Sequence, residues 1–154
     1  MPHATTGSLT RAPSRQPWTA SCGQPATGTK ARALHQTAVE AARQANDPGA
    51  EARALINLGG AYRLTGNYLA ATASLEQALD LCRTLGDRPG EAGALYTLGS
   101  VQDLTGDYLA AAANLQQALR LSRALGDRLG EANALTCLGT VQRTTGQHAA
   151  AHAR

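Results

Sequence analysis

Apolar side chains recur at helical spacing in the middle of the chain. Leu55, Leu58 and Tyr62 fall three and four residues apart, which places them on one stripe of an α-helix. Gly66 follows, and glycine readily adopts the left-handed conformation just past a helix C-terminus. We therefore predict a first helix from about residue 51 to residue 64.

A second amphipathic segment begins a few residues later. Its apolar positions are Tyr68, Ala71, Leu75, Ala78 and Leu79. Asn67 stands just before it and is a residue type whose side chain caps helix N-termini. Gly86 ends the segment, and Asp87 is placed to cap the helix that comes next. The pattern predicts two helices joined by a tight turn, and no part of the chain requires a strand.

This helix pair recurs with a period of 40 residues. Leu-Gly pairs stand in register at Leu58, Leu98 and Leu138, and Thr-Gly pairs at Thr65, Thr105 and Thr145. A fixed period of this length is the signature of a repeat architecture. The expected division of residues 30–154 is a half repeat, two full repeats and a partial repeat: 30–45, 46–85, 86–125 and 126–154.

Small residues recur where the two helices of a unit are expected to cross. The alanines at these positions are Ala71, Ala78, Ala111 and Ala118, and the mid-helix glycines are Gly59, Gly99 and Gly139. A glycine inside a helix costs roughly 1 kcal/mol relative to alanine. A cost repeated in every unit predicts close helix–helix contact there. The fold class is therefore all-α, with antiparallel helix pairs stacked as a solenoid.

The first 29 residues differ from the rest in composition. They are rich in Pro, Ser, Thr and Gly and lack apolar periodicity, so we expect a disordered tail. The first acidic residue is Glu40, and the basic residues before it are Arg11, Arg15, Lys30 and Arg32. The net charge of +3 therefore belongs to this end of the chain. The repeats carry no excess of positive charge, so nothing in them favours a nucleic-acid partner.

Targeting and redox signals are few. The tail loosely fits an organellar transit peptide, but a leader without function is the favoured interpretation. The three cysteines, Cys22, Cys82 and Cys137, are widely spaced and odd in number, which favours a reducing, cytoplasmic setting over a disulfide framework. No apolar run is long enough to span a membrane. The excess of Arg, Ala and Gly suggests a GC-rich bacterial genome.

Nothing in the sequence predicts an enzyme, and no cofactor is expected. The residues that recur are packing and turn residues, whereas a catalytic site gathers His, Ser, Cys or carboxylates in one place. His148 and His152 lie four apart on one helix face, a spacing that can hold a metal ion. No third ligand lies near them in the sequence, so we predict no metal site.

The repeat resembles the tetratricopeptide repeat (TPR) family. The first unit matches the family pattern at Leu55, Leu58-Gly59, Tyr62, Gly66, Tyr68, Ala71, Leu75 and Ala78. The second matches at Leu95, Leu98-Gly99, Gly106, Tyr108, Ala111, Leu115 and Ala118, and the third at Leu135, Leu138-Gly139, Gly146 and Ala151. The sequence departs from the pattern at Gln102, Gln142 and His148. The 40-residue unit exceeds the common length of about 34 and is similar to the long repeats of polarity adaptors and bacterial regulators.

The resemblance implies a right-handed superhelix whose concave groove is lined by the first helix of each pair. Family members bind peptides or helices of partner proteins there. The groove positions carried over are Arg53, Asn57, Gly60, Arg63, Tyr96, Ser100, Asp103, Asn133, Thr140 and Arg143. The main candidates for partner binding are Arg53, Asn57, Arg63, Tyr96, Asp103, Asn133 and Arg143. Each of them is equally open to interpretation as a solvated surface residue.

Two functional hypotheses follow. The first is a non-catalytic module that captures a peptide or helix of a partner protein. The second is a structural or regulatory fragment of a larger transcription or signalling regulator, because both ends fall inside repeats. Incomplete terminal repeats also predict marginal stability, or end-to-end self-association through the face that carries Leu135.

Overall fold

A computed structural model describes residues 24–153, and all of its regular elements in that range are α-helices. In chain order they are α3 (Gln24–Gln44), α4 (Pro48–Leu64), α5 (Tyr68–Leu85), α6 (Arg88–Thr105), α7 (Tyr108–Leu125) and α8 (Arg128–His152). Each helix packs antiparallel on the next, so the chain folds as an all-α solenoid. The expected helix pairs are α4 with α5 and α6 with α7.

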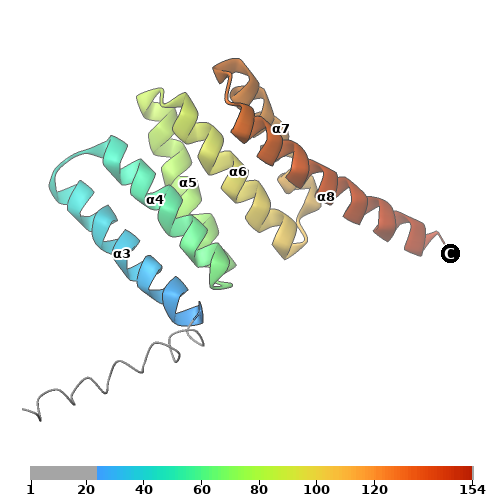
Figure 1. Cartoon of the computed structure of the whole chain (residues 1–154), viewed down its shortest axis with the longest axis horizontal. Helices are drawn as coiled ribbons and strands as arrows, with labels where there is room; N and C mark the ends of the chain where they lie inside the picture. Colours follow the sequence, from blue (N-terminus) through green and yellow to red (C-terminus); the bar gives the residue numbers. More distant parts are fainter. Residues whose placement is uncertain (1–23, 154) are drawn as a thin grey trace, which may run out of the picture.

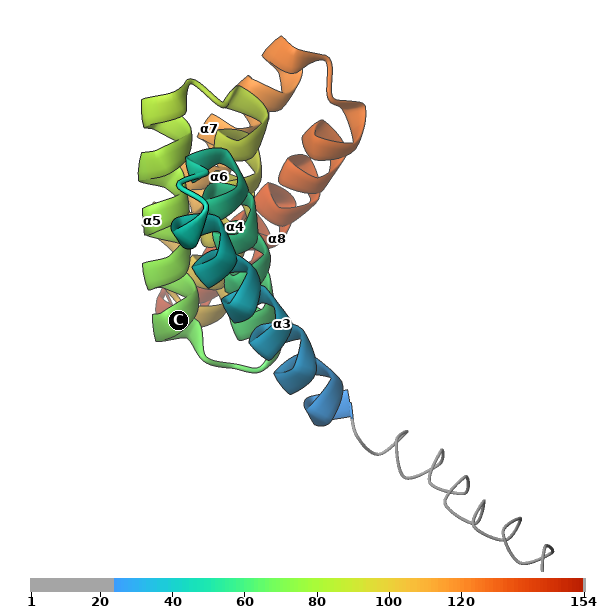
Figure 2. The ribbon, with the colours of Figure 1, turned by 90° about the vertical axis from the view of Figure 1, so that its left-hand side faces the viewer.

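The helices lie in two layers. α6 contacts α4 on one side and α8 on the other along one layer, and α5 and α7 lie behind them (Figure 1). Seen from the side, α5 forms one edge of the molecule and α4 and α6 lie inward of it (Figure 2). α3 and α8 stand at opposite ends of the solenoid.

The turns between helices follow local rules. Gly66 and Gly86 adopt φ of +81° and +70°, and this left-handed conformation lets the chain reverse without a clash at Cβ. Asn67 and Asp87 accept hydrogen bonds from the backbone N–H groups of Ala70 (3.3 Å) and Gly90 (3.0 Å). These caps satisfy donors that a helix start leaves unpaired. The predicted turns at these positions are confirmed.

The core confirms the predicted close crossings in the two complete pairs. Leu75 and Leu115 are fully buried. A Cβ added to Gly59 would lie 2.5 Å from the Cγ of Leu75, and one added to Gly99 would lie 2.7 Å from the Cγ of Leu115. Each glycine therefore makes room for a leucine of the partner helix. Ala71, Ala78, Ala111 and Ala118 are likewise buried.

Gly139 is an exception to that prediction. Within the described part of the chain, nothing lies within 4 Å of a Cβ added there. The reason is positional: α4 is covered by α5 and α6 by α7, whereas no described helix follows α8.

Two boundaries also differ from expectation. The tail was expected to extend to residue 29, but α3 begins at Gln24. A Cβ on Gly28 would lie 2.8 Å from Thr65, so this part of α3 packs against the end of α4. The other tail residues discussed above, Arg11, Arg15 and Cys22, lie outside the described residues. The second boundary is the start of α4, which lies at Pro48 because Asp47 caps the helix there.

The 40-residue period implies a turn at Gly146, like those at Gly66 and Gly106, but α8 continues through this position to His152. Asn67 and Asp107 cap the second helices of the complete pairs, whereas the equivalent residue here is Gln147. Glutamine is a poor N-cap, and the alanines that follow it are strong helix formers. With no cap to start a new helix, the existing helix extends.

Candidate functional site

The predicted partner-binding residues lie on α4, α6 and α8, exposed or half-buried, at repeat positions that share one side of these helices. We call this side the inner face. Tyr96 lies near its centre, on α6. Its half-buried ring packs against both the core around Leu95 and the core around Leu138. Tyr96 therefore lies at the junction of the α4, α6 and α8 packing.

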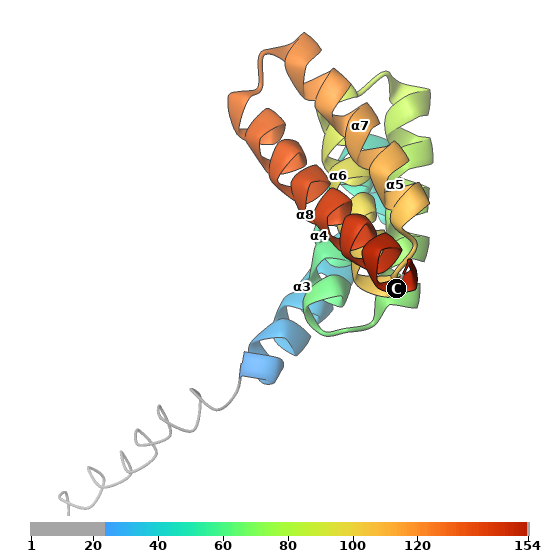
Figure 3. The same cartoon turned by 90° about the vertical axis from the view of Figure 1, so that its right-hand side faces the viewer.

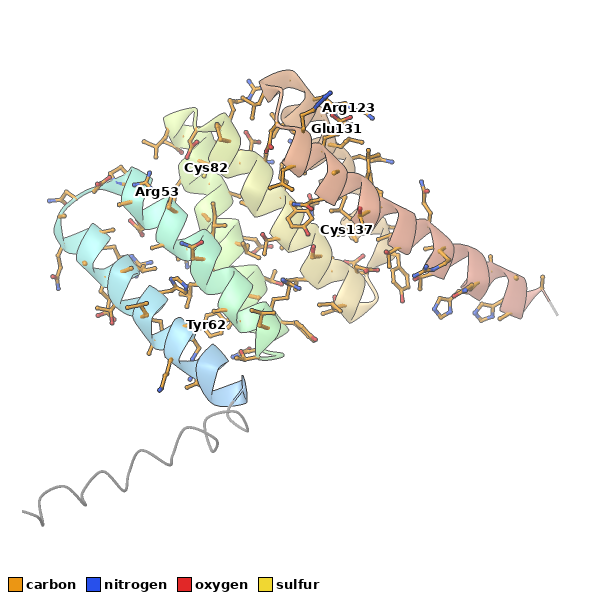
Figure 4. All side chains as sticks on the ribbon, in the orientation of Figure 1. Arg53, Tyr62, Cys82, Arg123, Glu131 and Cys137 are labelled. Atoms are coloured by element: carbon orange, nitrogen blue, oxygen red, sulfur yellow. The ribbon has the colours of Figure 1, made fainter. Side chains whose placement is uncertain are left out.

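Polar groups from all three helices surround Tyr96. The Sγ of Cys137, on α8, lies 3.8 Å from the Oγ of Ser100, on α6. Burial raises the pKa of the Tyr96 phenol, and the Cys137 thiol raises it further, while Ser100 and the positive charge of Arg63 oppose the rise. We call Arg63, Tyr96, Ser100 and Cys137 the Tyr96 cluster. Figure 4 shows Cys137 between α6 and α8.

Arg63 is the charged member of this cluster. Its side chain is half-buried, and its Nε is shielded from solvent and donates no hydrogen bond to the described protein. No carboxylate of residues 24–153 forms an ion pair with it. A guanidinium N–H that is shielded and unpaired costs free energy. The shielded Nε is closed to a ligand as well as to water, but no described carboxylate pairs with the positive charge of the guanidinium, and this charge favours an incoming carboxylate.

The remaining predicted residues stand apart from this cluster. Asp103 is half-buried, and the other four are exposed: Arg53, Asn57, Asn133 and Arg143. Their helices are α6 for Asp103, α4 for Arg53 and Asn57, and α8 for Asn133 and Arg143. No hydrogen bond or ion pair joins them to one another. The structure brings together Arg63 and Tyr96, and the others remain predicted contacts along the same layer.

Two hydroxyls of the predicted groove are already engaged. Ser100 Oγ donates to the carbonyl of Tyr96 at 3.0 Å, and Thr140 Oγ1 donates to that of Thr136 at 3.2 Å. Such bonds to the preceding turn occupy the hydroxyl proton. The amide of Asn57 and the guanidinium of Arg63 are therefore better placed to donate to a ligand.

Sequence reasoning did not assign Cys137 to this face. The signal was present, because Cys137 occupies the repeat position of Asn57 and Thr97. Residues at one repeat position face the same way in a solenoid, so the position of Asn57 predicts that of Cys137.

Sequence reasoning also missed a row of ion pairs at the helix junctions. Each pair joins the end of one helix to the first turn of the next: Arg43–Glu51 at 2.7 Å, Arg83–Glu91 at 3.0 Å and Arg123–Glu131 at 2.9 Å. Both members recur every 40 residues, which was the available signal. Figure 4 shows Arg123 and Glu131 together at one corner of the solenoid. The arginines are half-exposed, so these pairs are worth at most about 1 kcal/mol each.

The other cysteine of the described range is structural. Cys82 is fully buried between α5 and α6, and its thiol lies 3.9 Å from a carboxylate oxygen of Asp87. Burial raises the pKa of this thiol to about 11, and the negative charges of Asp87 and Glu91 add to the rise. A thiol with so little thiolate at neutral pH is a poor nucleophile. Both cysteines of the described range are free.

The metal and ligand possibilities are limited in the part of the chain that the structure describes. No three His, Cys, Asp or Glu side chains gather there as a metal site would require. The His148 ring instead contacts that of Tyr108, with centroids 5.8 Å apart. A hollow of about 210 Å³ between α3, α4 and α5, where Arg43 donates to Gln77, is smaller than usual ligand pockets of about 300–1,000 Å³. Among the described helices, none is both long enough and apolar enough to cross a bilayer.

Comparison with known families agrees with this architecture. The family model described as "Tetratricopeptide repeat" matches residues 28–84 and, in a second match that overlaps the first, residues 50–124. A comparison with curated proteins found no match. The two matched stretches together cover more than half of the chain and run from α3 to the last turn of α7. The chain belongs to the tetratricopeptide repeat family.

Proposed function

We propose that the inner face binds a peptide or helix of a partner protein through an acidic side chain or a C-terminal carboxylate. Tetratricopeptide repeats are generally protein-interaction modules, which supports the broader statement. The finer statement depends on the chemistry of the Tyr96 cluster. Free cysteines within residues 24–153 favour a cytoplasmic setting for such a module.

The positive charge of Arg63, which no described carboxylate pairs with, is the observation that carries the proposal. A carboxylate that accepts a hydrogen bond from this guanidinium forms a charge-assisted bond, the stronger class of such bonds. The Tyr96 ring beside it offers apolar surface to the rest of the ligand, as aromatic anchors commonly do at interfaces. Tyr96 and Arg63 lie on different helices, so the ligand would bridge α4 and α6.

The charge of the inner face favours the same ligand. Arg53, Arg63 and Arg143 form no ion pair with a described carboxylate, whereas Arg43, Arg83 and Arg123 do. The inner face carries one acidic residue beside these three arginines, the half-buried Asp103. The inner face is therefore more positive than the solenoid as a whole, which steers an acidic partner toward it.

The test compares two labelled peptides of equal length, one rich in Glu and one with Lys in place of each Glu. We expect the full-length protein to bind the acidic peptide and not the basic one, as measured by fluorescence anisotropy. Arg63→Gln removes the charge and should weaken binding roughly tenfold, since a hydrogen bond to a charged group contributes about 1.5–3 kcal/mol. A combined Arg53→Gln, Asn57→Ala and Arg143→Gln variant should weaken it further.

Arg123→Gln is the matched control, because it removes an arginine that already pairs with Glu131 away from the inner face. Circular dichroism checks that each variant keeps its helices. Equal binding of the two peptides contradicts the proposal. It is also contradicted if Arg123→Gln lowers the affinity for the acidic peptide as much as Arg63→Gln does. The second result would indicate attraction by net charge alone.

A further inference from the structure

The outer side of α8 is an open helix face. Ala132, Leu135 and Gly139 lie three and four residues apart, and all three are exposed, Leu135 by 45%. Their equivalents on α4 are buried beneath α5: Ala52 is 0% exposed, Leu55 is 3% exposed, and Gly59 accommodates Leu75. The face of α8 thus repeats a packing surface and has no described helix against it.

The outer side of α3 is open in the complementary way. Ala38 is exposed, whereas the alanines at the same repeat position, Ala78 and Ala118, are 0% and 1% exposed. Leu34 is 67% exposed, whereas Ser74 at its position is 8% exposed. α3 therefore corresponds to α5 and α7, but the helix that should precede it is missing from the described range.

The contact that would cover both faces already occurs twice inside the molecule. α5 packs on α4 with Leu75 over Gly59, and α7 packs on α6 with Leu115 over Gly99. The equivalent of these leucines on α3 is His35, and the equivalent of the glycines on α8 is Gly139. α8 and α3 thus carry the two complementary surfaces of the interface that joins α4 to α5 and α6 to α7.

The two halves cannot meet within one molecule, because α3 and α8 stand at opposite ends of the solenoid (Figure 1; Figure 3 shows the α8 end). The two faces also carry no acidic residue, Lys or Arg at the positions that would be covered. These positions are Ala31, Leu34, His35, Ala38 and Ala41 on α3, and Ala132, Leu135, Gly139 and Gln142 on α8. Docking them would therefore bury no carboxylate, ammonium or guanidinium group.

We propose that a second copy of this chain covers each face, with α3 of one molecule docked on the outer side of α8 of the next. The joint would rebuild a complete helix pair and continue the solenoid across two molecules. Such a contact is heterologous and leaves one open α3 and one open α8, so association can proceed beyond the dimer. This assembly is separate from ligand capture on the inner face.

Sedimentation velocity of the full-length protein over a wide concentration range tests the proposal. We expect the wild type to associate as the concentration rises. Gly139→Leu fills the socket on α8, and Ala38→Arg places a charge on the α3 face. Each substitution is at an uncrowded position of the monomer, so circular dichroism should show an intact fold. Each should weaken association roughly tenfold or more, since overpacking or a buried charge opposes docking.

Mixing the two variants gives the sharpest result. The Ala38→Arg molecule keeps its α8 face and the Gly139→Leu molecule keeps its α3 face, so the mixture should form a heterodimer that grows no further. Ala113→Arg, at an exposed alanine of α7, is the matched control and should associate like the wild type. His35→Leu restores the leucine of the internal pairs and should strengthen association roughly tenfold, by more apolar burial.

Three results would overturn the proposal. A wild type that stays monomeric at every concentration excludes it. Self-association of the Ala38→Arg variant at wild-type strength shows that α3 is not the occupant, for instance because α8 pairs with a second α8. A mixture of the two variants that stays monomeric excludes the joint between α8 and α3 directly.

Discussion

α6 and α8 carry the same repeat positions in different surroundings. Leu95 on α6 is fully buried, whereas Leu135 at the same position of α8 is 45% exposed. Gly99 is crowded by Leu115, whereas Gly139 has open space where a Cβ would be. The difference lies in the next helix: α7 covers this face of α6, and no described helix covers the same face of α8. Burial in a solenoid is therefore conferred by the neighbouring element, because each unit contacts only those beside it.

The largest test of this comparison is truncation of the equivalent leucines. Leu95→Ala leaves a cavity between α6 and α7 and should lower the free energy of unfolding by about 2–5 kcal/mol. Leu135→Ala should lower it by less than about 1 kcal/mol, because much of that side chain already contacts water. Urea unfolding at low protein concentration, where the molecule is monomeric, measures both. Equal losses would show that something covers α8 in solution.

Alanine at the equivalent glycines should change stability in opposite directions. Gly99→Ala gains helix propensity but pushes a methyl group into Leu115, and we expect a net loss of about 1–3 kcal/mol. Gly139→Ala meets nothing and should gain roughly 1 kcal/mol from propensity alone. The same urea titration reports both signs. A gain at Gly99 would mean that α7 moves aside easily and that the crossing is loose.

The smallest effect concerns the junctions before α6 and α8, where Cys82 and Ser122 occupy the same position. The pKa of Cys82 rises from 9.0 to about 11 on folding. Its contribution to stability is therefore complete below pH 9 and is lost as the pH rises toward 11. Cys82→Ser introduces the residue that the other junction carries at Ser122. Between pH 7 and pH 10 the free energy of unfolding of the wild type should fall by about 1 kcal/mol more than that of this variant.

Unfolding free energies of the two proteins at pH 7 and pH 10 give this difference. The buried Tyr96 phenol also has a raised pKa, but it is present in both proteins, and its contribution cancels. Parallel pH dependence in the two proteins would show that the Cys82 thiol ionises as easily as an exposed one.

Much of the fold could be predicted from short stretches of sequence. The turns at Gly66 and Gly86 and the cap at Asn67 depend on residues within one helix turn. They can therefore be predicted without knowledge of the helices that pack against them. The turn that the period implies at Gly146 does not form, because the Thr-Gly pair recurs there while the cap does not. Gln147 was visible in the sequence, and its weakness as an N-cap was the missed signal.

The candidate site was less predictable. Arg63 and Tyr96 were placed on the same layer by their repeat positions, but nothing local indicated that the Nε of Arg63 would be shielded and unpaired. The location of Cys137 on the inner face could be predicted in the same way, because Cys137 occupies the repeat position of Asn57. Its contact with Ser100 depends on how closely α8 approaches α6.

The sequence by itself determined the helices, the 40-residue period, the turn chemistry and the family, because periodicity and capping act over a few residues. Only the tertiary structure decided which copies of a repeated position are buried. Leu55, Leu95 and Leu135 are the same residue in the same local pattern, and their exposures are 3%, 0% and 45%. The physical reason is that burial requires a surface from another helix, and the pattern within one helix cannot state whether that surface is present.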